Sequence, residues 1–541
     1  MLRNLRTLLP VFLLVLTSPA HSFDFNSTCS SIASQIAIPN ATVSLVDFVP
    51  AGTNLTFPNN DPSCARPSQL VLTDMCRIAM AVATSNRSGF DFEAWLPRNW
   101  TGRFLSTGNP GLSGCIQFED LAYGSALGFA TVGTNNGHDG DTGAPFLNNP
   151  DVLADFAFRA IHTSVLVGKN LTEAFYGSPH NRSYYLGCST GGRQGLKSVQ
   201  DFPEDFDGVI AGAPVIDFNH LIDWTGHFFG ITGNSSAPTF LPPDQWISVV
   251  HPDVLAQCDE IDGVKDGVIE DPNLCDYDPS GLVCADPAGG NQTDTNSTTC
   301  ITEAQAEMIR EVFQPFFIQG KFAYPRMQPG TEDVPIYYLG EPFMYARDWF
   351  RFVVYSDPNH DVTTLSDKDW ALAEELDPFN ISTWSGDLSA FRDRQGKLLT
   401  FHGQADGLVS SRNSERYYRR VEATMGLDNT ELDEFFRFFR ISGMGHCSTG
   451  VGAWEVGQNL AGAGNISDLN LDPGSNILTA MVRWVEEGVA PEDVLGTKFV
   501  NDTVEDGVQF ARRHCRYPLR NTYDGVGDPT KEESWSCQRV E

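Results

Sequence analysis

A serine between two glycines is the residue of this chain best placed to act as a nucleophile. Residues 187–191 read Gly-Cys-Ser-Thr-Gly and fit the pattern G-x-S-x-G, with Ser189 at its centre. A β-prone run at 184–186 precedes it, and a segment able to form a helix follows. A chain that turns from strand to helix within so few residues leaves no room for Cβ atoms beside the serine, which is held strained with its hydroxyl exposed. Because the pattern also occurs by chance, the prediction depends on partners for Ser189.

The partners are a base and an acid further along the chain. A nucleophilic serine needs a histidine to take its proton and a carboxylate to hold the tautomer of that histidine. Asp406 follows a predicted buried strand at 397–403, and His446 follows a predicted strand at 435–441. Enzymes of the α/β-hydrolase fold carry the triad in the order Ser, Asp or Glu, His. Ser189, Asp406 and His446 are therefore the predicted catalytic triad, and a turn carboxylate and a loop histidine are the alternatives.

Two cysteines flank this triad. Cys188 precedes the serine and Cys447 follows the histidine. A disulfide requires Cα atoms within roughly 7 Å of each other. If Cys188 and Cys447 are bonded, Ser189 and His446 are neighbours in space although about 250 residues separate them in the sequence. This coincidence is much rarer than the serine pattern alone, and it favours catalysis.

With these residues in place, the chain resembles the fungal tannase and feruloyl esterase family. The resemblance rests on Cys188-Ser189, on the run Ser-Thr-Gly-Gly-Arg-Gln-Gly after the cysteine, on Asp406 and on His446-Cys447, and it extends over essentially the whole mature chain. It implies an α/β-hydrolase with a large inserted lid, a disulfide-tethered serine triad, a structural calcium ion in the lid and aromatic-acid esters as substrates. The first expectation is a secreted feruloyl esterase that hydrolyses hydroxycinnamate esters of plant cell-wall polysaccharides. The alternative is a tannase acting on galloyl esters, or another aromatic carboxylic ester hydrolase.

A glycine-rich turn is the candidate for the second half of an oxyanion hole. A predicted strand at 103–106 runs into residues 107–114, Thr-Gly-Asn-Pro-Gly-Leu-Ser-Gly. In α/β-hydrolases such a turn supplies one backbone N–H to the oxyanion, and the residue after the nucleophile, here Thr190, supplies the other. Proline has no N–H, so Gly108 or Asn109 is expected to donate, and the sequence does not decide between them. An ordinary surface turn is the alternative.

The elements that must position these residues alternate between strand and helix. Apolar runs at 42–49, 68–80, 90–97, 129–135 and 206–214 predict strands, and apolar spacing over 151–167 predicts a helix. This alternation favours an α/β fold, a mostly parallel sheet with helices on both faces. The rhythm stops after residue 215 and resumes at 397, after which 410–421 and 475–487 look helical. We therefore expect a hydrolase domain in two parts, 23–215 and 397–541, with a lid domain at 216–396.

Within the lid, an acidic and glycine-rich loop at 258–270 is a candidate calcium site. Ca²⁺ prefers several oxygen ligands, both carboxylates and backbone carbonyls, and glycines let a loop wrap around the ion. The spacing of the carboxylates differs from the EF-hand pattern. A solvated acidic turn is the alternative, and similarity to the calcium loop of the family favours a structural site that stiffens the lid. No redox or organic cofactor is implied. The expected ligands are the side chains of Asp259, Asp262 and Asp266 and the carbonyls of Val264 and Val268.

The lid is also rich in aromatic residues. They are suited either to line an aromatic acyl pocket or to form the lid's own core, and for any one of them the core is the more frequent outcome. These residues are Trp224, Phe228, Phe229, Phe343, Tyr345, Trp349, Phe350 and Phe352.

The first 22 residues predict a secretory signal peptide. Arg3 and Arg6 form its positive start, 8–16 its apolar core and 20–22 a small-x-small cleavage site. The apolar run is too short to span a bilayer, and no other stretch of roughly 20 apolar residues is present. Loss of the two arginines takes the formal charge from −33 to −35, and so acidic a chain is repelled by nucleic acid. We expect a secreted, extracellular protein with neither a membrane nor a nucleic-acid partner.

The cysteines and glycosylation sequons agree with secretion. Twelve cysteines are an even set, which in a secreted chain predicts six disulfides, while the C-x-x-C spacing of a zinc site is absent. Thirteen N-x-[ST] sequons predict a glycosylated surface. Proximity in the sequence predicts the disulfides Cys258–Cys275, Cys284–Cys300 and Cys515–Cys537, and the family resemblance implies Cys29–Cys76, Cys64–Cys115 and Cys188–Cys447.

One rival from another class is a non-catalytic binding glycoprotein built on an inactive hydrolase scaffold. Its signature is a replaced nucleophile or base, and neither replacement is found at Ser189 or His446. The residues favour a serine esterase with a small aromatic ester or a feruloylated saccharide as substrate. The sequence leaves open the substrate-binding residues of the lid, the choice between feruloyl and galloyl esters, and the oligomeric state.

Overall fold

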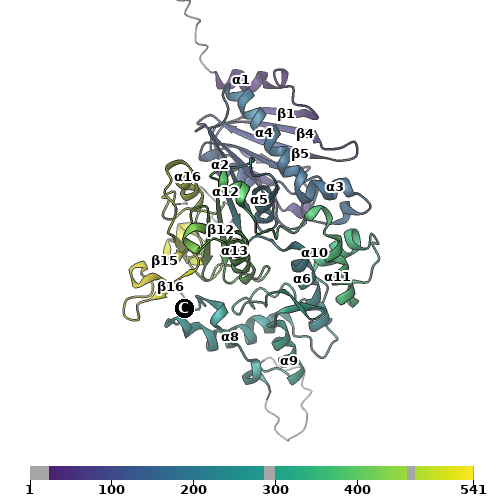
Figure 1. The fold of residues 1–541 in the computed structure, drawn as a ribbon, viewed down its shortest axis with the longest axis vertical. Helices are drawn as coiled ribbons and strands as arrows, with labels where there is room; N and C mark the ends of the chain where they lie inside the picture. Colours follow the sequence, from purple (N-terminus) through teal and green to yellow (C-terminus); the bar gives the residue numbers. More distant parts are fainter. Residues whose placement is uncertain (1–23, 285–298, 460–469, 540–541) are drawn as a thin grey trace, which may run out of the picture.

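The computed structural model describes residues 24–284, 299–459 and 470–539 (Figure 1). The predicted signal peptide at 1–22 lies outside the described residues, as do the sequons at Asn291, Asn296 and Asn465. Within the described ranges, no helix is both long and apolar enough to cross a membrane.

A nine-stranded sheet forms the centre of the molecule, in the order β1-β4-β5-β7-β6-β8-β9-β12-β13. The strands from β7 to β13 pair in parallel, and β1, β4 and β5 extend the sheet in antiparallel fashion at one edge. The mostly parallel sheet predicted from the sequence is confirmed. The strands are β1 (Ala41–Val49), β4 (Met75–Ala83), β5 (Gly89–Pro97), β6 (Arg103–Thr107), β7 (Phe129–Thr134), β8 (Arg182–Cys188), β9 (Gly208–Gly212), β12 (Lys397–Gly403) and β13 (Phe436–Ile441).

Helices cover both faces of this sheet. On one face α4 (Ala160–Tyr176), α5 (Thr190–Asp201) and α13 (Arg412–Met425) share an apolar core with the sheet. On the other face α2 (Phe118–Ala126) and α16 (Ile477–Glu487) do the same. Parallel strands buried on both faces are expected to be apolar without alternation, and β8, β9 and β12 are buried along nearly their whole length. The predicted helix at 151–167 is the start of a longer one, formed by α3 (Pro150–Ala154), a π-helical turn and α4.

The strand order reverses between β6 and β8. From β6 the chain continues to β7 on one side, and it later returns to β8 on the other side of β6. In open α/β sheets the crevice at such a reversal, beyond the carboxyl ends of the strands, is the usual place for a ligand. The turn after β6 and the residue after β8 meet there, and these are the glycine-rich turn and Ser189.

The stretch between β9 and β12 forms a separate helical layer below the sheet in Figure 1. Among the described residues of this stretch no strand joins the large sheet, and a short hairpin pairs β10 (Phe316–Ile318) with β11 (Lys321–Tyr324). The layer has its own core, and its largest side chains are fully buried in it. It corresponds to the predicted lid. Its helices include α6 (Phe218–Thr232), α8 (His251–Cys258), α9 (Glu303–Val312), α10 (Met344–Trp349) and α11 (Asp367–Leu376). The last helix of the stretch, α12 (Ser389–Asp393), packs instead beside α5 in the apolar core of the sheet (Figure 1).

The C-terminal segment is more ordered than its polar sequence indicates. Strand β14 (Asp493–Phe499) pairs with β15 (Val508–Cys515), and β16 (Leu519–Tyr523) pairs with β17 (Trp535–Arg539). The disulfide Cys515–Cys537 joins these two hairpins. All six predicted disulfides are present, including the three that the family resemblance implied.

Candidate active site

Ser189 lies on a sharp turn between β8 and α5. Its backbone has φ 64° and ψ −126°, a strained conformation for a residue with a side chain. The strain is held by neighbours on both sides, because the Ser189 N–H donates to the Gly212 carbonyl and the Ser189 carbonyl accepts from the Arg193 N–H. A Cβ on Gly187 would lie 2.8 Å from the backbone of Gly191, so a side chain there would displace the turn. The strand-turn-helix context predicted for the serine is present.

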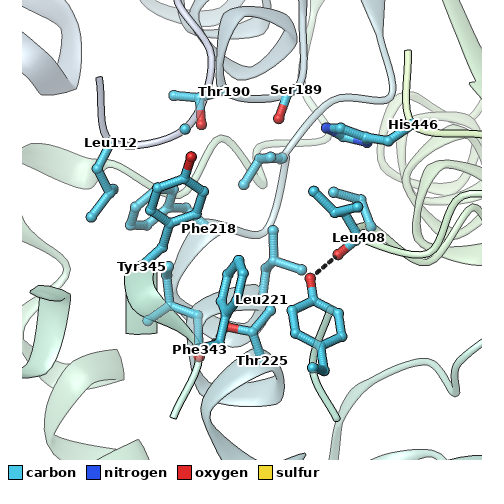
Figure 2. Close-up of a pocket in the computed structure, with 15 residues that line it drawn as sticks. Leu112, Ser189, Thr190, Phe218, Leu221, Thr225, Phe343, Tyr345, Leu408 and His446 are labelled. Carbon is cyan, nitrogen blue, oxygen red and sulfur yellow. Dashed lines mark hydrogen bonds between the residues drawn. The ribbon is translucent and has the colours of Figure 1, made fainter. Parts of the chain in front are cut away.

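Asp406 and His446 are joined directly. The His446 Nδ1 lies 2.7 Å from Asp406 Oδ2. Figure 2 shows the imidazole of His446 beside the hydroxyl of Ser189 at the top of a pocket that both residues line. The carboxyl of Asp406 is fully buried, which by itself would raise its pKa. The charge of His446 and the hydrogen bonds from His402 and His446 outweigh burial and hold the pKa of Asp406 well below its usual range. The carboxylate therefore stays ionised and able to stabilise an imidazolium.

The disulfide between Cys188 and Cys447 closes the site from the side of the sheet. The Cα atoms of the two cysteines are 6.0 Å apart, and the bond connects positions 259 residues apart in the sequence. It therefore fixes the residue before the serine to the residue after the histidine, as the sequence argument anticipated. Cys447 has φ 68°, which points the chain from His446 into the disulfide.

The structure corrects the predicted second oxyanion donor. The Gly108 N–H donates to the Leu186 carbonyl at 3.0 Å, and the Asn109 N–H donates to Gln194 Oε1 at 2.9 Å. Both N–H groups are therefore already occupied, and neither faces the pocket. The physical reason is that the turn continues the strand pairing of β6 with β8 for one residue and then docks on α5. The pocket is instead lined by Gly111 and Leu112, one step further along the turn.

Gly111 and Leu112 have backbone N–H groups that are available to a ligand. Within the part of the chain that the structure describes, these two N–H groups have no hydrogen-bond acceptor. Gly111 has φ 56°, a conformation suited to glycine, and a Cβ there would lie 2.4 Å from the Tyr345 hydroxyl. Thr190, whose N–H is one of the unpaired donors at the start of α5, also lines the pocket.

The pocket is a slot, partly open to solvent, that runs from Ser189 into the lid. Figure 2 shows Phe218, Leu221 and Phe343 along the slot and Thr225 at the end far from the serine. His446 is its one residue with an ionisable acidic or basic side chain apart from two tyrosines. The tyrosine hydroxyls are engaged, Tyr345 with Asp141 Oδ2 at 2.8 Å and Tyr337 with the Leu408 carbonyl at 2.5 Å. The slot thus suits a flat apolar group.

Only two of the predicted lid aromatics line this slot. They are Phe343 and Tyr345. Phe218 and Tyr337, which the sequence argument did not single out, complete the aromatic lining. Trp224, Phe228, Trp349 and Phe350 are fully buried in the core of the lid, and Phe352 is half-buried against it. Phe229 is half-buried outside the slot lining.

Comparison with known proteins identifies the family. The model of the family described as tannase and feruloyl esterase matches residues 76–340 and 343–538. The chain belongs to the tannase and feruloyl esterase family. A protein of Aspergillus terreus named probable feruloyl esterase B-2 is 52% identical over 533 residues, which cover 98% of each chain. The crystal structure of feruloyl esterase B from Aspergillus oryzae is 48% identical and has a TM-score of 0.90, covering 95% of this chain and 100% of the other.

A further solved structure, less similar in sequence, shares the fold. The structure of tannin acyl hydrolase from Aspergillus niger is 23% identical, with a TM-score of 0.72 and 96% of each chain covered. At that identity the likeness shows the architecture of the family and does not extend to the substrate.

Two residues near the triad, His402 and Gln194, were not identified from the sequence. His402, inside β12, is fully buried and contacts Asp406. Gln194 on α5 accepts from the Asn109 N–H, and its amide donates to the side-chain oxygen of Asn136 at 3.1 Å. The available signal was a polar residue inside an apolar strand or helix face, since a buried polar side chain requires a partner.

The candidate calcium loop folds back on its own backbone. Asp259 accepts from the Gly267 N–H, Asp262 from the Val264 N–H and Asp266 from the Val268 N–H. Burial, together with the charges of Asp266 and Asp259, raises the pKa of Asp262 to about 6. Its Oδ2 atom is buried without a partner, whereas Asp266 Oδ2 pairs with Arg512 at 2.7 Å. Among the described residues, no group of three or more His, Cys, Asp or Glu side chains is placed to hold a metal ion.

Proposed function

We propose that this protein is a secreted serine esterase that hydrolyses feruloyl and related hydroxycinnamoyl esters of plant cell-wall polysaccharides. The observation that carries the proposal is the position of Ser189 and His446 at the mouth of an aromatic slot with no acidic side chain in its lining. The relatives named feruloyl esterase B, at about half identity over the full chain, support the same activity.

In the proposed reaction Ser189 attacks the ester carbonyl as His446 takes the proton of its hydroxyl. Asp406 keeps the imidazole oriented through the bond to Nδ1 and stabilises the imidazolium. The imidazolium then protonates the leaving alcohol, which is the sugar of the polysaccharide. Water attacks the acyl-enzyme by the same route, with His446 again as base, and releases the aromatic acid and the free serine.

Backbone N–H groups of two segments would receive the oxyanion. Thr190 at the start of α5 supplies the first, where the helix dipole also favours a negative charge. In place of Gly108 and Asn109, we assign the second to the free N–H groups of Gly111 and Leu112, which line the pocket beside the serine. Gln194 fixes this turn by holding the Asn109 N–H.

The slot favours a cinnamoyl over a galloyl group. A gallate ring carries three hydroxyls, each of which needs a polar partner on leaving water, because unpaired buried polar groups are costly. The lining offers Thr225 and two tyrosine hydroxyls that are already engaged. A methoxylated ring on a longer apolar arm meets Phe218, Leu221 and Phe343 instead. Galloyl esters remain the alternative substrate because the family includes tannases.

We further propose that the loop at 258–270 holds a structural calcium ion. The oxygen-rich set suits a hard cation, and the partnerless Asp262 Oδ2 beside two other carboxylates is an arrangement that a cation would stabilise. Asp259, Asp262 and Asp266 and the carbonyls of Val264 and Val268 would hold it. The loop lies in the lid, so the ion would stiffen the lid and take no part in ester cleavage. Secretion is supported by the leader-like start of the chain and by the six disulfides.

The first experiment is the initial rate on methyl ferulate against methyl gallate for the wild type and for Ser189→Ala. We expect preference for ferulate and a loss of about 10⁴-fold or more in the variant, because no other group can form the acyl-enzyme. Full activity in Ser189→Ala would refute the triad. Preference for gallate would keep the triad and reassign the substrate to the tannase side. A melting curve of the variant like that of the wild type checks that its fold is intact.

A further inference from the structure

The acid of the triad has a second histidine bound to it. His402 is fully buried in β12, and its Nε2 atom lies 3.1 Å from Asp406 Oδ2, the same oxygen that accepts from His446. The other oxygen, Oδ1, accepts the backbone N–H groups of Leu408 and Val409 at 2.8 and 2.9 Å. Four N–H donors therefore fill the accepting capacity of one carboxylate.

The surroundings of His402 determine which of its nitrogens carries the proton. Its Nε2 faces only acceptors, namely the Asp406 carboxylate and the Val409 carbonyl at 3.0 Å. Nε2 must therefore be the N–H. Its Nδ1 lies 2.7 Å from the Ser414 hydroxyl on α13, which donates to it. The ring is thus held at both ends, by a side chain of a neighbouring helix and by the catalytic carboxylate.

We propose that His402 is a positioning residue of the triad, which fixes Asp406 Oδ2 and shares its negative charge with His446. The proposal rests on the proposed esterase function and extends it. Two effects follow from the shared oxygen. The bond from His402 prevents rotation of the carboxylate away from His446, which preserves the rate. It also draws charge from Oδ2, so the imidazolium of His446 is stabilised less than it would be by a carboxylate serving His446 alone.

The second effect has a signature that a merely structural residue would not give. In His402→Leu, the charge of Asp406 acts on His446 alone, so the imidazolium of His446 persists to higher pH. The neutral His446 that acts as the base therefore forms only at a higher pH than in the wild type. The acid limb of the pH profile of kcat/KM is therefore expected to move to higher pH, by about 0.5 unit or more. We also expect kcat to fall about 10- to 100-fold with KM nearly unchanged, because the loss is one of geometry at the reacting centre.

His402→Gln is the conservative variant. The side-chain amide of glutamine can place an N–H close to the position of Nε2 and donate to Asp406 Oδ2. This variant is expected to retain activity within about 3-fold of the wild type. The acid limb of its pH profile of kcat/KM should not move. His514→Gln is the matched control, because His514 is also buried, with its Nε2 2.7 Å from the Ala453 carbonyl and no contact with the triad. It should leave the pH profile unchanged.

The measurements are pH profiles on methyl ferulate, with melting curves to check folding. An unmoved or lowered acid limb in His402→Leu, or a loss in His402→Gln as large as in His402→Leu, would overturn the proposal. If His402→Leu does not fold, Ser414→Ala replaces it: loosening the ring should give a smaller kcat loss and a shift in the same direction, and an unchanged profile would refute the role. An inactive wild type would refute the esterase function and is recognised before any variant is compared.

Discussion

At the scale of single residues, the site contains one ionised carboxylate, that of Asp406, held by fixed N–H donors. Asp406 is ionised because the charge of His446 and the hydrogen bonds of both histidines outweigh its burial. Burial pushes several other carboxyls, such as those of Asp223 and Glu270, toward the neutral form. Glu455 is an example: burial raises its pKa from the ordinary 4.5 to about 7, opposed in part by a hydrogen bond from the Gly457 N–H. Its Oε2 atom is buried without a partner.

Glu455 therefore predicts a pH dependence of stability. The folded state keeps the proton up to about pH 7, whereas the unfolded chain releases it near 4.5, so stability falls as the pH rises through this window. In the wild type, this group should lower the free energy of unfolding by about 3 kcal/mol as the pH rises, and we expect Glu455→Gln to abolish that decrease. The amide is neutral at every pH and can still accept the hydrogen bond from the Gly457 N–H. Denaturant unfolding of the wild type and the variant at pH 5 and pH 8 measures this difference in unfolding free energy.

The control for this measurement is Glu311→Gln, which makes the same exchange at an exposed position of α9. Its unfolding free energy should depend on pH as that of the wild type does. Equal pH dependence in Glu455→Gln and the wild type would show that the Glu455 carboxyl is ionised in the folded protein.

At the scale of elements, the site is built where three strands end. β6 leads into the turn with the free N–H groups, β8 ends at Ser189, and β12 leads to Asp406. The disulfide Cys188–Cys447 ties the end of β8 to the loop after β13, which carries His446. The serine and the histidine are thus joined covalently, while the acid is held by hydrogen bonds alone.

The disulfide is expected to matter for rate more than for folding. The double variant Cys188→Ala with Cys447→Ala frees the His446 loop, so we expect kcat on methyl ferulate to fall at least about 10-fold. The matched control, Cys284→Ala with Cys300→Ala, removes a lid disulfide that bridges 16 residues and lies outside the slot lining. That control should keep kcat within about 2-fold. Equal kcat in both double variants would contradict the positioning role of Cys188–Cys447.

How much of this could be predicted from the sequence differs between elements. The triad, the parallel sheet and three of the disulfides follow from short local patterns, such as Gly-x-Ser-x-Gly before a helix and apolar runs of strand length. The other three disulfides came from the family resemblance. The second oxyanion donor did not follow, because which N–H is occupied depends on how far β6 pairs with β8 and on the contact of Asn109 with Gln194 across two elements. His402 was hidden for the same reason, since its partner Ser414 lies on another element.

At the scale of the whole molecule, the lid contributes most of an apolar core, and several members of that core, such as Phe218, Leu221 and Tyr337, also line the slot. Trp224, Phe228 and Trp349 pack inside it, and the slot is lined by one edge of α6 and by the segment around Phe343. The sequence shows that the lid is rich in aromatic residues. It does not show which of them lie in the core and which line the pocket, because both environments favour the same residue types. The acidic loop lies at the end of this layer, against the C-terminal hairpins, where Arg512 pairs with Asp266.

A calcium ion in this loop would couple to the stability of the entire fold. Chelation by EDTA in metal-free buffer is expected to lower the melting temperature by several degrees, on the order of 5 °C, because a ligand that binds only the folded state stabilises it. Asp262→Asn should abolish this response. Glu260→Gln removes the same charge from an exposed position of the same loop and should preserve it. A wild-type melting curve that EDTA does not move would refute the site.

The bond between Cys188 and Cys447 has one more consequence, which concerns cleavage by proteases. It joins two cysteines 259 residues apart in the sequence, and the span between them contains the complete lid. A single cut anywhere in the span therefore leaves two fragments that remain covalently attached on either side of Ser189 and His446. A single nick in the lid therefore does not separate the fragment that carries Ser189 from the fragment that carries His446.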